Sequence, residues 1–311
     1  MRSSDGGPAI SVRGLRKAYG EVEAVRGIDL TVRAGEVFAL LGPNGAGKTT
    51  TVEILEGFRP RDGGDVDVLG FDPAAGPRHL KERIGIVLQS TGIEPYLTVA
   101  ETIEMYRGYY PHPRPVDEIV EVVGLSEKRD GRVSKLSGGQ QRRLDVAIAL
   151  AGDPVLLFLD EPTTGFDPGA RRNAWDMIRN LRALGKTVLL TTHYMDEAQA
   201  LADDVAIINR GEIVARGHPT TLGGRDTADT RIRFRLPEAD VGELPDPLRS
   251  AASDHEGDVV LTTPEPTRLL HELTGWAIGR GIELANLHVT KPSLEDVYLE
   301  ITGGDAGPEE G

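Results

Sequence analysis

Short apolar runs alternate with helical patterns along the first two thirds of the chain. Residues 37–41 (VFALL), 155–160 (VLLFLD) and 187–192 (TVLLTT) are nearly continuous apolar stretches. Such runs are typical of strands that are buried on both faces of a parallel sheet. Residues 49–57 (TTTVEILEG) and 136–152 (LSGGQQRRLDVAIALAG) instead carry apolar positions at helical spacing. The pattern predicts an α/β domain in which helices follow buried strands.

Two other stretches of this domain have a different pattern. Residues 10–35 alternate apolar and polar positions around glycine turns, which predicts an antiparallel edge of paired strands. Residues 92–135 contain two helical candidates, 99–110 and 116–125, and Pro111, Pro113 and Pro115 prevent them from joining into one helix. We therefore expect a helical insertion at 92–135 within a domain that spans 10–222.

The last third predicts a small α+β domain over residues 230–303, after a polar linker at 223–229. RIRFRL (231–236) alternates as a half-buried strand with a row of solvated arginines, or with arginines that pair with acids of another subunit. Two further strands (258–263 and 282–290) and a helix (267–281) follow. A final helix is expected to begin at a Ser293 cap, with Asp296 at its third position. Residues 1–9 and 304–311 have a composition typical of disorder.

Composition narrows the class of protein. The 311 residues carry a net charge of −14, and the phosphate backbones of nucleic acids favour the opposite charge. No apolar run approaches the roughly 18 residues that a membrane-spanning helix needs, and no hydrophobic signal segment opens the chain. The absence of cysteine excludes disulfides and thiolate metal sites. These features predict a cytosolic protein, not exported, that binds no nucleic acid and reaches a membrane only through a protein partner.

The most specific motif is GPNGAGKT at residues 42–49, which fits the phosphate-loop pattern and stands between a strand and a helix. Its glycines let backbone N–H groups approach phosphate oxygens. Lys48 supplies a positive charge for the terminal phosphates, and the Thr49 hydroxyl is a candidate Mg²⁺ ligand. We expect a nucleoside triphosphate to bind here.

A second anion site is predicted where the helix after Ser137 begins, because Ser137 is a good N-cap and two glycines leave the first amides uncovered. Asp160 and Glu161 end a buried strand, so they should lie at the carboxyl edge of the sheet, near the phosphates. Asp160 is a candidate Mg²⁺ ligand and Glu161 a candidate base for attacking water. His193 ends another strand at the same edge. Arg142 and Arg143 are interpreted as a solvated helix face with no chemical role.

Taken together, these motifs resemble the nucleotide-binding subunit of an ATP-binding-cassette (ABC) transporter, over about residues 10–222. The Walker A loop matches 42–50, the LSGGQ signature matches 136–140, and Walker B with its glutamate matches 155–161. Residues 165–168 match the D-loop, in which Phe166 stands where this subgroup more often has leucine. The resemblance implies a P-loop NTPase fold with an antiparallel β edge and a helical subdomain at 92–135.

The resemblance also implies the site residues. Glu161 and His193 would be catalytic, and Thr49, Gln89 and Asp160 would hold Mg²⁺. ATP would contact the following residues: Tyr19 (stacking on adenine), Gly42, Pro43, Asn44, Gly45, Ala46, Gly47, Lys48, Thr49, Thr50, Ser137, Gly138, Gly139 and Gln140.

In this family two cassettes pack head to tail, and the signature of one closes the site of the other. A homodimer is the leading hypothesis, and a different partner cassette is the alternative. The ending PSLEDVYLEITG (292–303) and residues 57–73 resemble cassettes of daunorubicin-resistance-type drug exporters and related lipid exporters. The resemblance implies a separate membrane subunit of the ABC-2 type and a place at the cytoplasmic face of the membrane. The 230–303 region would pair with that subunit or only stabilise the dimer.

Two other functions are open at this point. One is a soluble ABC ATPase in translation or DNA repair, although tandem cassettes, coiled-coil insertions and basic surfaces are missing from the sequence. The other is a regulatory module that binds nucleotide without hydrolysis, against which Lys48, Asp160, Glu161 and His193 argue. The transported substrate and the direction of transport cannot be deduced from the cassette.

Overall fold

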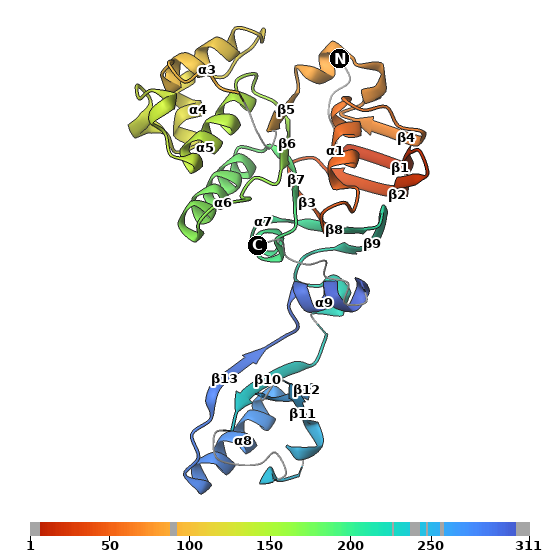
Figure 1. The fold of residues 1–311 in the computed structure, drawn as a ribbon, viewed down its shortest axis with the longest axis vertical. Coiled ribbons are helices and arrows are strands. Elements are labelled where there is room, and N and C mark those ends of the chain that lie inside the picture. The colour runs from red at the N-terminus through yellow and green to blue at the C-terminus, as the bar shows by residue number, and fades with distance from the viewer. Residues whose placement is uncertain are drawn as a thin grey trace. The chain divides into compact units, whose positions relative to one another are not determined.

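The computed structural model describes residues 7–87, 92–225, 227–236, 243–246, 248–255 and 258–302. The chain separates into two compact units, with the division between Pro219 and Thr220 (Figure 1). Gln89 and both predicted disordered ends, apart from residues 7–9, lie outside the described residues. Within the described ranges, no helix combines the length and apolar character that crossing a bilayer requires.

The first unit is built around a six-stranded sheet of order β5-β6-β7-β3-β8-β9. The first five of these strands run parallel, and β9 pairs with β8 in the antiparallel direction. The strands are β3 (Val37–Leu41), β5 (Ile84–Val87), β6 (Leu156–Asp160), β7 (Thr187–Thr192), β8 (Asp204–Asn209) and β9 (Glu212–Gly217). All five residues of β3 and all six of β7 are buried, as expected for strands covered on both faces. The three predicted central strands are confirmed.

A second, antiparallel sheet of order β2-β1-β4 belongs to the same unit. Its strands are β1 (Pro8–Tyr19), β2 (Val22–Arg33) and β4 (Gly63–Val68). The hairpin of β1 and β2 confirms the predicted edge, whereas β4 joins from a segment that was not predicted as a strand. Apolar side chains of both sheets and of α1 (Lys48–Glu56) form one buried core. This core holds the Walker A loop, which connects β3 to α1.

The helices of this unit lie around the sheets (Figure 1). The insertion contains α3 (Val99–Arg107) and α4 (Val116–Val122), which confirms both helical candidates and the break at the prolines. The other helices are α2 (Arg78–Lys81), α5 (Gly138–Ala149), α6 (Pro168–Ala183) and α7 (Met195–Leu201). Short 3-10 turns occupy Pro73–Ala75, Ser126–Lys128 and Val133–Lys135. Because α5 contacts both α3 and β5, the signature helix joins the insertion to the central sheet.

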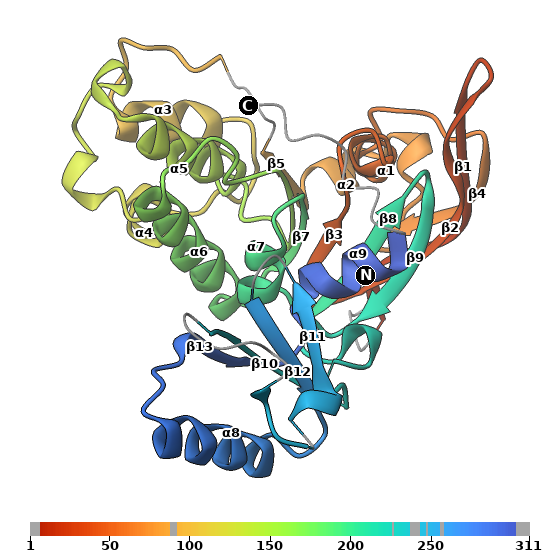
Figure 2. The ribbon, with the colours of Figure 1, turned by 60° about the horizontal axis from the view of Figure 1, so that its bottom comes forward.

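The second unit is a four-stranded antiparallel sheet of order β11-β12-β10-β13, with α8 packed on β10 (Figure 2). Its elements are β10 (Thr230–Arg235), β11 (Ala252–His255), β12 (Asp258–Thr263), α8 (Pro266–Arg280), β13 (Ala285–Thr290) and α9 (Leu294–Thr302), with 3-10 turns at Leu222–Gly224 and Arg249–Ala251. Ile232 and Phe234 of β10 are fully buried in its core, as their alternation predicts. The predicted cap is confirmed, because Ser293 Oγ accepts from the Asp296 amide at 3.0 Å.

Three details of this unit differ from expectation. Strand β11 was not predicted. The unit begins at Thr220, upstream of the predicted linker, and Leu222 is buried. The arginine row is neither simply solvated nor left for another subunit, because Arg233 and Arg235 each lie 2.8 Å from Asp258. The facing acid comes from the neighbouring strand β12, which sequence alternation alone does not identify.

Candidate nucleotide site

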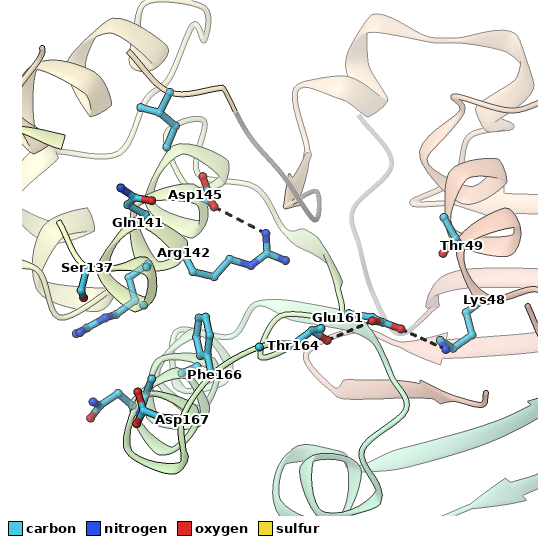
Figure 3. A pocket seen from close by; sticks show the side chains of 18 of the residues that line it. Lys48, Thr49, Ser137, Gln141, Arg142, Asp145, Glu161, Thr164, Phe166 and Asp167 are labelled. Atoms are coloured by element: carbon cyan, nitrogen blue, oxygen red, sulfur yellow. Dashed lines mark hydrogen bonds and ion pairs between the residues drawn. The ribbon is translucent and has the colours of Figure 1, made fainter. Parts of the chain in front are cut away.

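A cleft of about 1470 Å³ opens in the first unit at the carboxyl edge of the parallel strands. One wall is the Walker A loop, the opposite wall is the start of α5, and Glu161 lies between them (Figure 3); residues 164–167 also line the cleft. Known ligand pockets hold roughly 300–1,000 Å³. The cleft therefore has a larger volume than a typical pocket shaped around one ligand.

Two positions of the Walker A loop, Gly42 and Gly47, admit glycine and little else. Gly47 has φ +106, and a Cβ there would lie 2.4 Å from the Ala24 carbonyl oxygen. A Cβ at Gly42 would lie 2.3 Å from the Ile208 carbonyl oxygen. Gly47 caps α1 in the left-handed conformation, and within the described part of the chain no side chain accepts from its first amides. These amides are positioned to receive an anion.

The Lys48 side chain is buried, and its Nζ donates to the Gly42 carbonyl at 2.7 Å and to the Pro43 carbonyl at 3.2 Å. It also lies 3.3 Å from Glu161 Oε1. Burial lowers the pKa of Lys48, and the negative charge of Glu161 opposes that shift. The lysine thus stands beside the loop that should hold phosphate, and a carboxylate balances its charge.

The Glu161 carboxylate contacts several other residues of the site. Its Oε1 lies 3.3 Å from His193 Nδ1, close enough for an ion pair but misaligned for a hydrogen bond. The Thr164 hydroxyl donates to Oε2 at 3.2 Å. Burial by itself would raise the pKa of Glu161, but the neighbouring Lys48 and His193 lower it below its ordinary value. Glu161 is therefore ionised at neutral pH, the state that a proton acceptor needs.

Asp160 and Glu161 lie together at the carboxyl edge of the sheet, as predicted, and their side chains point in different directions. Asp160 Oδ1 accepts from the Thr191 hydroxyl at 2.5 Å, whereas the Glu161 carboxylate turns toward Lys48. The Thr49 hydroxyl side chain lines the cleft (Figure 3). No group of three or more acidic, histidine or cysteine side chains suited to a metal occurs among the described residues. One carboxylate and one hydroxyl fit Mg²⁺ bound together with phosphate and water, since Mg²⁺ seldom uses an all-protein cage.

The signature helix begins with a closed capping box. The Ser137 amide donates to Gln140 Oε1 at 2.9 Å, and the Gln140 amide donates back to Ser137 Oγ at 3.4 Å. Ser137, Gly138 and Gly139 line the cleft on the side opposite Thr49 (Figure 3). No hydrogen bond or ion pair between described residues joins this segment to the Walker A loop. The two glycine-rich ends thus face one cleft without meeting.

Some predicted residues do not line the cleft. Tyr19 ends β1 and is 41% exposed, and the cations of Lys17 and Arg59 lie 5.6 and 5.3 Å from its ring centre. Gly42, Ala46, Gln140, Asp160 and His193 are also absent from the cleft lining, although the contacts above connect several of them to it. The roles assigned to all these residues stay predictions.

The interpretation of Arg142 as a solvated residue is wrong. Arg142 is only 9% exposed, and its Nη2 donates to the Asp160 carbonyl oxygen at 2.8 Å. Its Nη1 lies 3.7 Å from Asp145 (Figure 3). The sequence does carry a signal, because Arg142, Val146 and Ala149 are spaced as one helix face and all three are buried. Arg143 is half-buried and donates to the Gly124 carbonyl.

A buried glutamate near the site was also missed. Glu197 of α7 is fully buried, and its Oε1 accepts from the Thr163 hydroxyl at 2.8 Å. Burial raises its pKa, and the neighbouring Thr192 and Thr163 side chains partly offset that shift. This contact connects the segment after Glu161 to the helix after His193.

Two family models match the chain. The model described as ABC transporter matches residues 25–164, and the model described as the C-terminal domain of ABC transporter domain-containing protein-like chains matches 230–293.

Similar proteins match nearly the full length. The Nod factor export ATP-binding protein I of Burkholderia lata is 38% identical over 94% of this chain and 97% of its own. The daunorubicin resistance ATP-binding protein DrrA2 of Streptomyces coeruleorubidus is 36% identical over 96% of both chains. The linearmycin resistance ATP-binding protein LnrL of Bacillus subtilis is 34% identical over 94% of this chain and 98% of its own.

Solved structures agree on the fold. The ADP conformation of MJ1267, an ATP-binding cassette of an ABC transporter, aligns with a TM-score of 0.59 and 26% identity over 68% of this chain and 91% of that one. The dimeric post-hydrolysis structure of the cassette MJ0796 aligns with a TM-score of 0.59 and 24% identity over 67% of this chain and 98% of that one. The chain belongs to the ATP-binding proteins of ABC transporters, and the expected P-loop cassette fold is confirmed.

Proposed function

We propose that this chain hydrolyses ATP as the nucleotide-binding subunit of an ABC exporter. The observation that carries the proposal is the convergence of Lys48 and His193 on Glu161 Oε1, each at 3.3 Å, beside the Walker A loop. A phosphate-binding cation and an ionised carboxylate at one sheet edge are the parts that phosphoryl transfer to water needs.

The Walker A residues bind the triphosphate. The free amides at the start of α1 and the ammonium of Lys48 take the phosphate oxygens. Thr49 and Asp160 hold Mg²⁺, with Gln89 as the third predicted ligand; the metal supplies charge neutralisation on the phosphates when bound. Tyr19 stacks on the adenine.

Glu161 acts as the base for attacking water. In the structure its Oε1 lies 3.3 Å from Lys48 Nζ. When phosphate oxygens replace this carboxylate as the partner of Lys48, Oε1 is released to accept a proton from water. His193 then stays beside the carboxylate and the terminal phosphate, where its N–H stabilises the developing charge.

A second copy of the chain completes each site. The Walker A loop and the signature segment line opposite sides of a cleft of about 1470 Å³, a larger volume than typical ligand pockets have. A two-fold pairing places Ser137, Gly138, Gly139 and Gln140 of each copy over the nucleotide held by the other, forming two equal sites.

Transport follows through a separate membrane subunit of the ABC-2 type, which holds the chain at the cytoplasmic face. The relatives that cover the whole chain are named for Nod factor export and for resistance to daunorubicin and linearmycin. Their names favour export over a role in translation, DNA repair or regulation, and the exported molecule that we propose is a drug, an antibiotic or a lipid.

Glu161→Gln tests the catalytic assignment. The amide keeps the shape but cannot accept a proton, so we expect ATP hydrolysis to fall by about 100-fold or more while ATP binding persists. The purified variant should form a stable dimer with ATP and Mg²⁺ in size-exclusion chromatography. Glu118→Gln, an exposed acid of α4, is the control and should hydrolyse ATP like the parent. Parental hydrolysis by Glu161→Gln would refute the assignment.

Disulfide crosslinking tests the dimer. The chain has no cysteine, so Gly45→Cys and Ser137→Cys introduce the only thiols. A Cβ at Gly45 meets no atom within 4 Å, although its φ of +78 carries some strain. In the Glu161→Gln background with ATP, the double variant should crosslink into a dimer while each single variant should not. Crosslinking that is independent of ATP, or absent, would contradict the head-to-tail arrangement.

A further inference from the structure

The peptide group between Asp160 and Glu161 is held from two sides by side chains of other elements. Its carbonyl oxygen accepts from Arg142 Nη2 at 2.8 Å, and the Glu161 amide donates to Thr191 Oγ1 at 3.0 Å. Thr191 belongs to the central strand β7, whereas Arg142 belongs to the signature helix α5. The backbone that enters Glu161 is therefore fixed by the sheet and by the signature helix together.

These two hydrogen bonds matter because Glu161 has an unusual backbone conformation. Its φ is +44, in the left-handed region that a residue with a Cβ avoids. Such a conformation persists only where surrounding contacts over-determine it. The buried guanidinium of Arg142 is one of those contacts, and Asp145, 3.7 Å away on the same helix, balances its charge.

Arg142 also stands close to the signature itself. It is one helical turn beyond Gly138, the first residue of α5. A helix transmits displacement along its length because its backbone hydrogen bonds keep a fixed rise per residue. Any movement of Ser137 and Gly138 toward a nucleotide therefore reaches the guanidinium, and through it the peptide before Glu161.

We propose that Arg142 is a positioning residue that ties the signature helix of each chain to the Glu161 of the same chain. This inference rests on the proposed function, in which the signature serves the partner's nucleotide and Glu161 serves its own. Arg142 thereby connects the two sites of the dimer: closure of one site over its nucleotide sets the carboxylate geometry of the other. Hydrolysis at the two sites becomes cooperative.

The experiment compares Arg142→Met, which keeps the length but removes the donors, with Arg142→Lys, which keeps one donor. For Arg142→Met we expect kcat for ATP hydrolysis to fall roughly ten- to hundred-fold, the range for losing a hydrogen bond to a charged group. KM should change little, because the Walker A contacts stay intact, and the Hill coefficient for ATP should fall toward one. Arg142→Lys should recover part of kcat and of the cooperativity.

Arg114→Met is the matched control. Arg114 has a side chain 16% exposed and lies 2.9 Å from Asp153, away from the cleft. Thermal unfolding of both variants separates a loss of stability from a loss of positioning. Equal kcat and Hill coefficient in Arg142→Met and Arg114→Met would overturn the inference.

A double variant shows whether Arg142 acts through Glu161. In the Glu161→Gln background, Arg142→Met should cause no further loss of the residual hydrolysis, because the group that it positions is gone. A full multiplicative loss would overturn the inference while leaving the proposed function intact. Parental hydrolysis by Glu161→Gln alone would instead overturn the proposed function, and this inference with it.

Discussion

The two glycine-rich helix starts that line the cleft, at α1 and at α5, differ in how their first backbone amides are capped. At α1 the cap is Gly47, which has no side chain to accept from the first amides. At α5 the Ser137 and Gln140 side chains satisfy each other's amides. Helix starts leave amides that need partners. The Walker A start therefore leaves its first amides for a ligand, whereas the signature start caps two of its amides within the single chain and leaves those of Gly138 and Gly139 for a phosphate.

The charges around the two helices differ as well. The first residue of α1 is the buried cation Lys48, and its last is the buried acid Glu56. On α5 a buried arginine lies close to a buried acid of the same helix. The α1 cation is balanced by Glu161, a carboxylate of another segment 3.3 Å away, whereas the α5 cation lies beside an acid of its own helix.

The largest expected difference comes from adding a methyl group to each start. Gly47→Ala places a Cβ at φ +106, 2.4 Å from the Ala24 carbonyl. The strain and overlap should lower the free energy of unfolding by about 2–5 kcal/mol. Gly138→Ala meets no atom within 4 Å and should change it by less than about 1 kcal/mol. Urea unfolding of both variants checks this; equal losses would remove the contrast between the two starts.

Lys48→Met should reveal what the α1 cation contributes to ATP binding. Losing a charge-assisted contact to phosphate should weaken ATP binding by roughly ten- to hundred-fold. Lys186→Met is the control, because Lys186 is also buried but lies 2.7 Å from Asp153, away from the cleft. Isothermal titration calorimetry measures the ATP affinity of each variant. Parental affinity in Lys48→Met would show that Lys48 does not contribute to ATP binding.

The other end of α1 predicts a pH effect. Burial, with the nearby acids Asp160 and Glu53, raises the pKa of Glu56 from 4.5 to about 8. The folded chain thus holds a proton that the unfolded chain releases, so this part of the stability is complete below about pH 4.5 and is lost as pH rises toward 8. Between about pH 6 and 7 the free energy of unfolding should fall by at most about 1.4 kcal/mol.

Glu56→Gln should remove this slope, since an amide cannot titrate. Thermal unfolding of parent and variant across that pH range, without nucleotide or Mg²⁺, measures the difference. Glu121→Gln, an exposed acid of α4, serves as the control. Parallel pH profiles for the parent and Glu56→Gln would show that Glu56 is charged at neutral pH.

The smallest effect is expected from opening the signature cap. Ser137→Ala removes the acceptor of the Gln140 amide and should lower the free energy of unfolding by about 1 kcal/mol. ATP binding by the single chain should stay unchanged, because the Walker A contacts are untouched, while ATP-driven dimerisation should weaken. A calorimetric titration together with size-exclusion chromatography separates the two. Weaker ATP binding by the single chain would mean that both starts already share one nucleotide.

Much of this site could be predicted from the sequence, because its determinants are local. A strand, a glycine loop and a helix in order predict a phosphate cradle, and the structure has that order at residues 37–56. The cap at Ser137, the helices of the insertion and the alternation of β10 follow from spacing within a few residues. The buried strands that end at Asp160 and Thr192 were recognisable from their apolar runs.

Only the tertiary structure determines the contacts between segments that are distant in the chain. Sequence spacing does not show that Arg142 reaches the Asp160 carbonyl, that Thr163 meets Glu197, or that Asp258 pairs with the arginines of β10. The left-handed backbone of Glu161 and the raised pKa of Glu56 also depend on neighbours brought close by folding. Spacing determines which residues share an element, whereas packing determines which elements meet, and burial sets the charge state of a group and the partner that it needs.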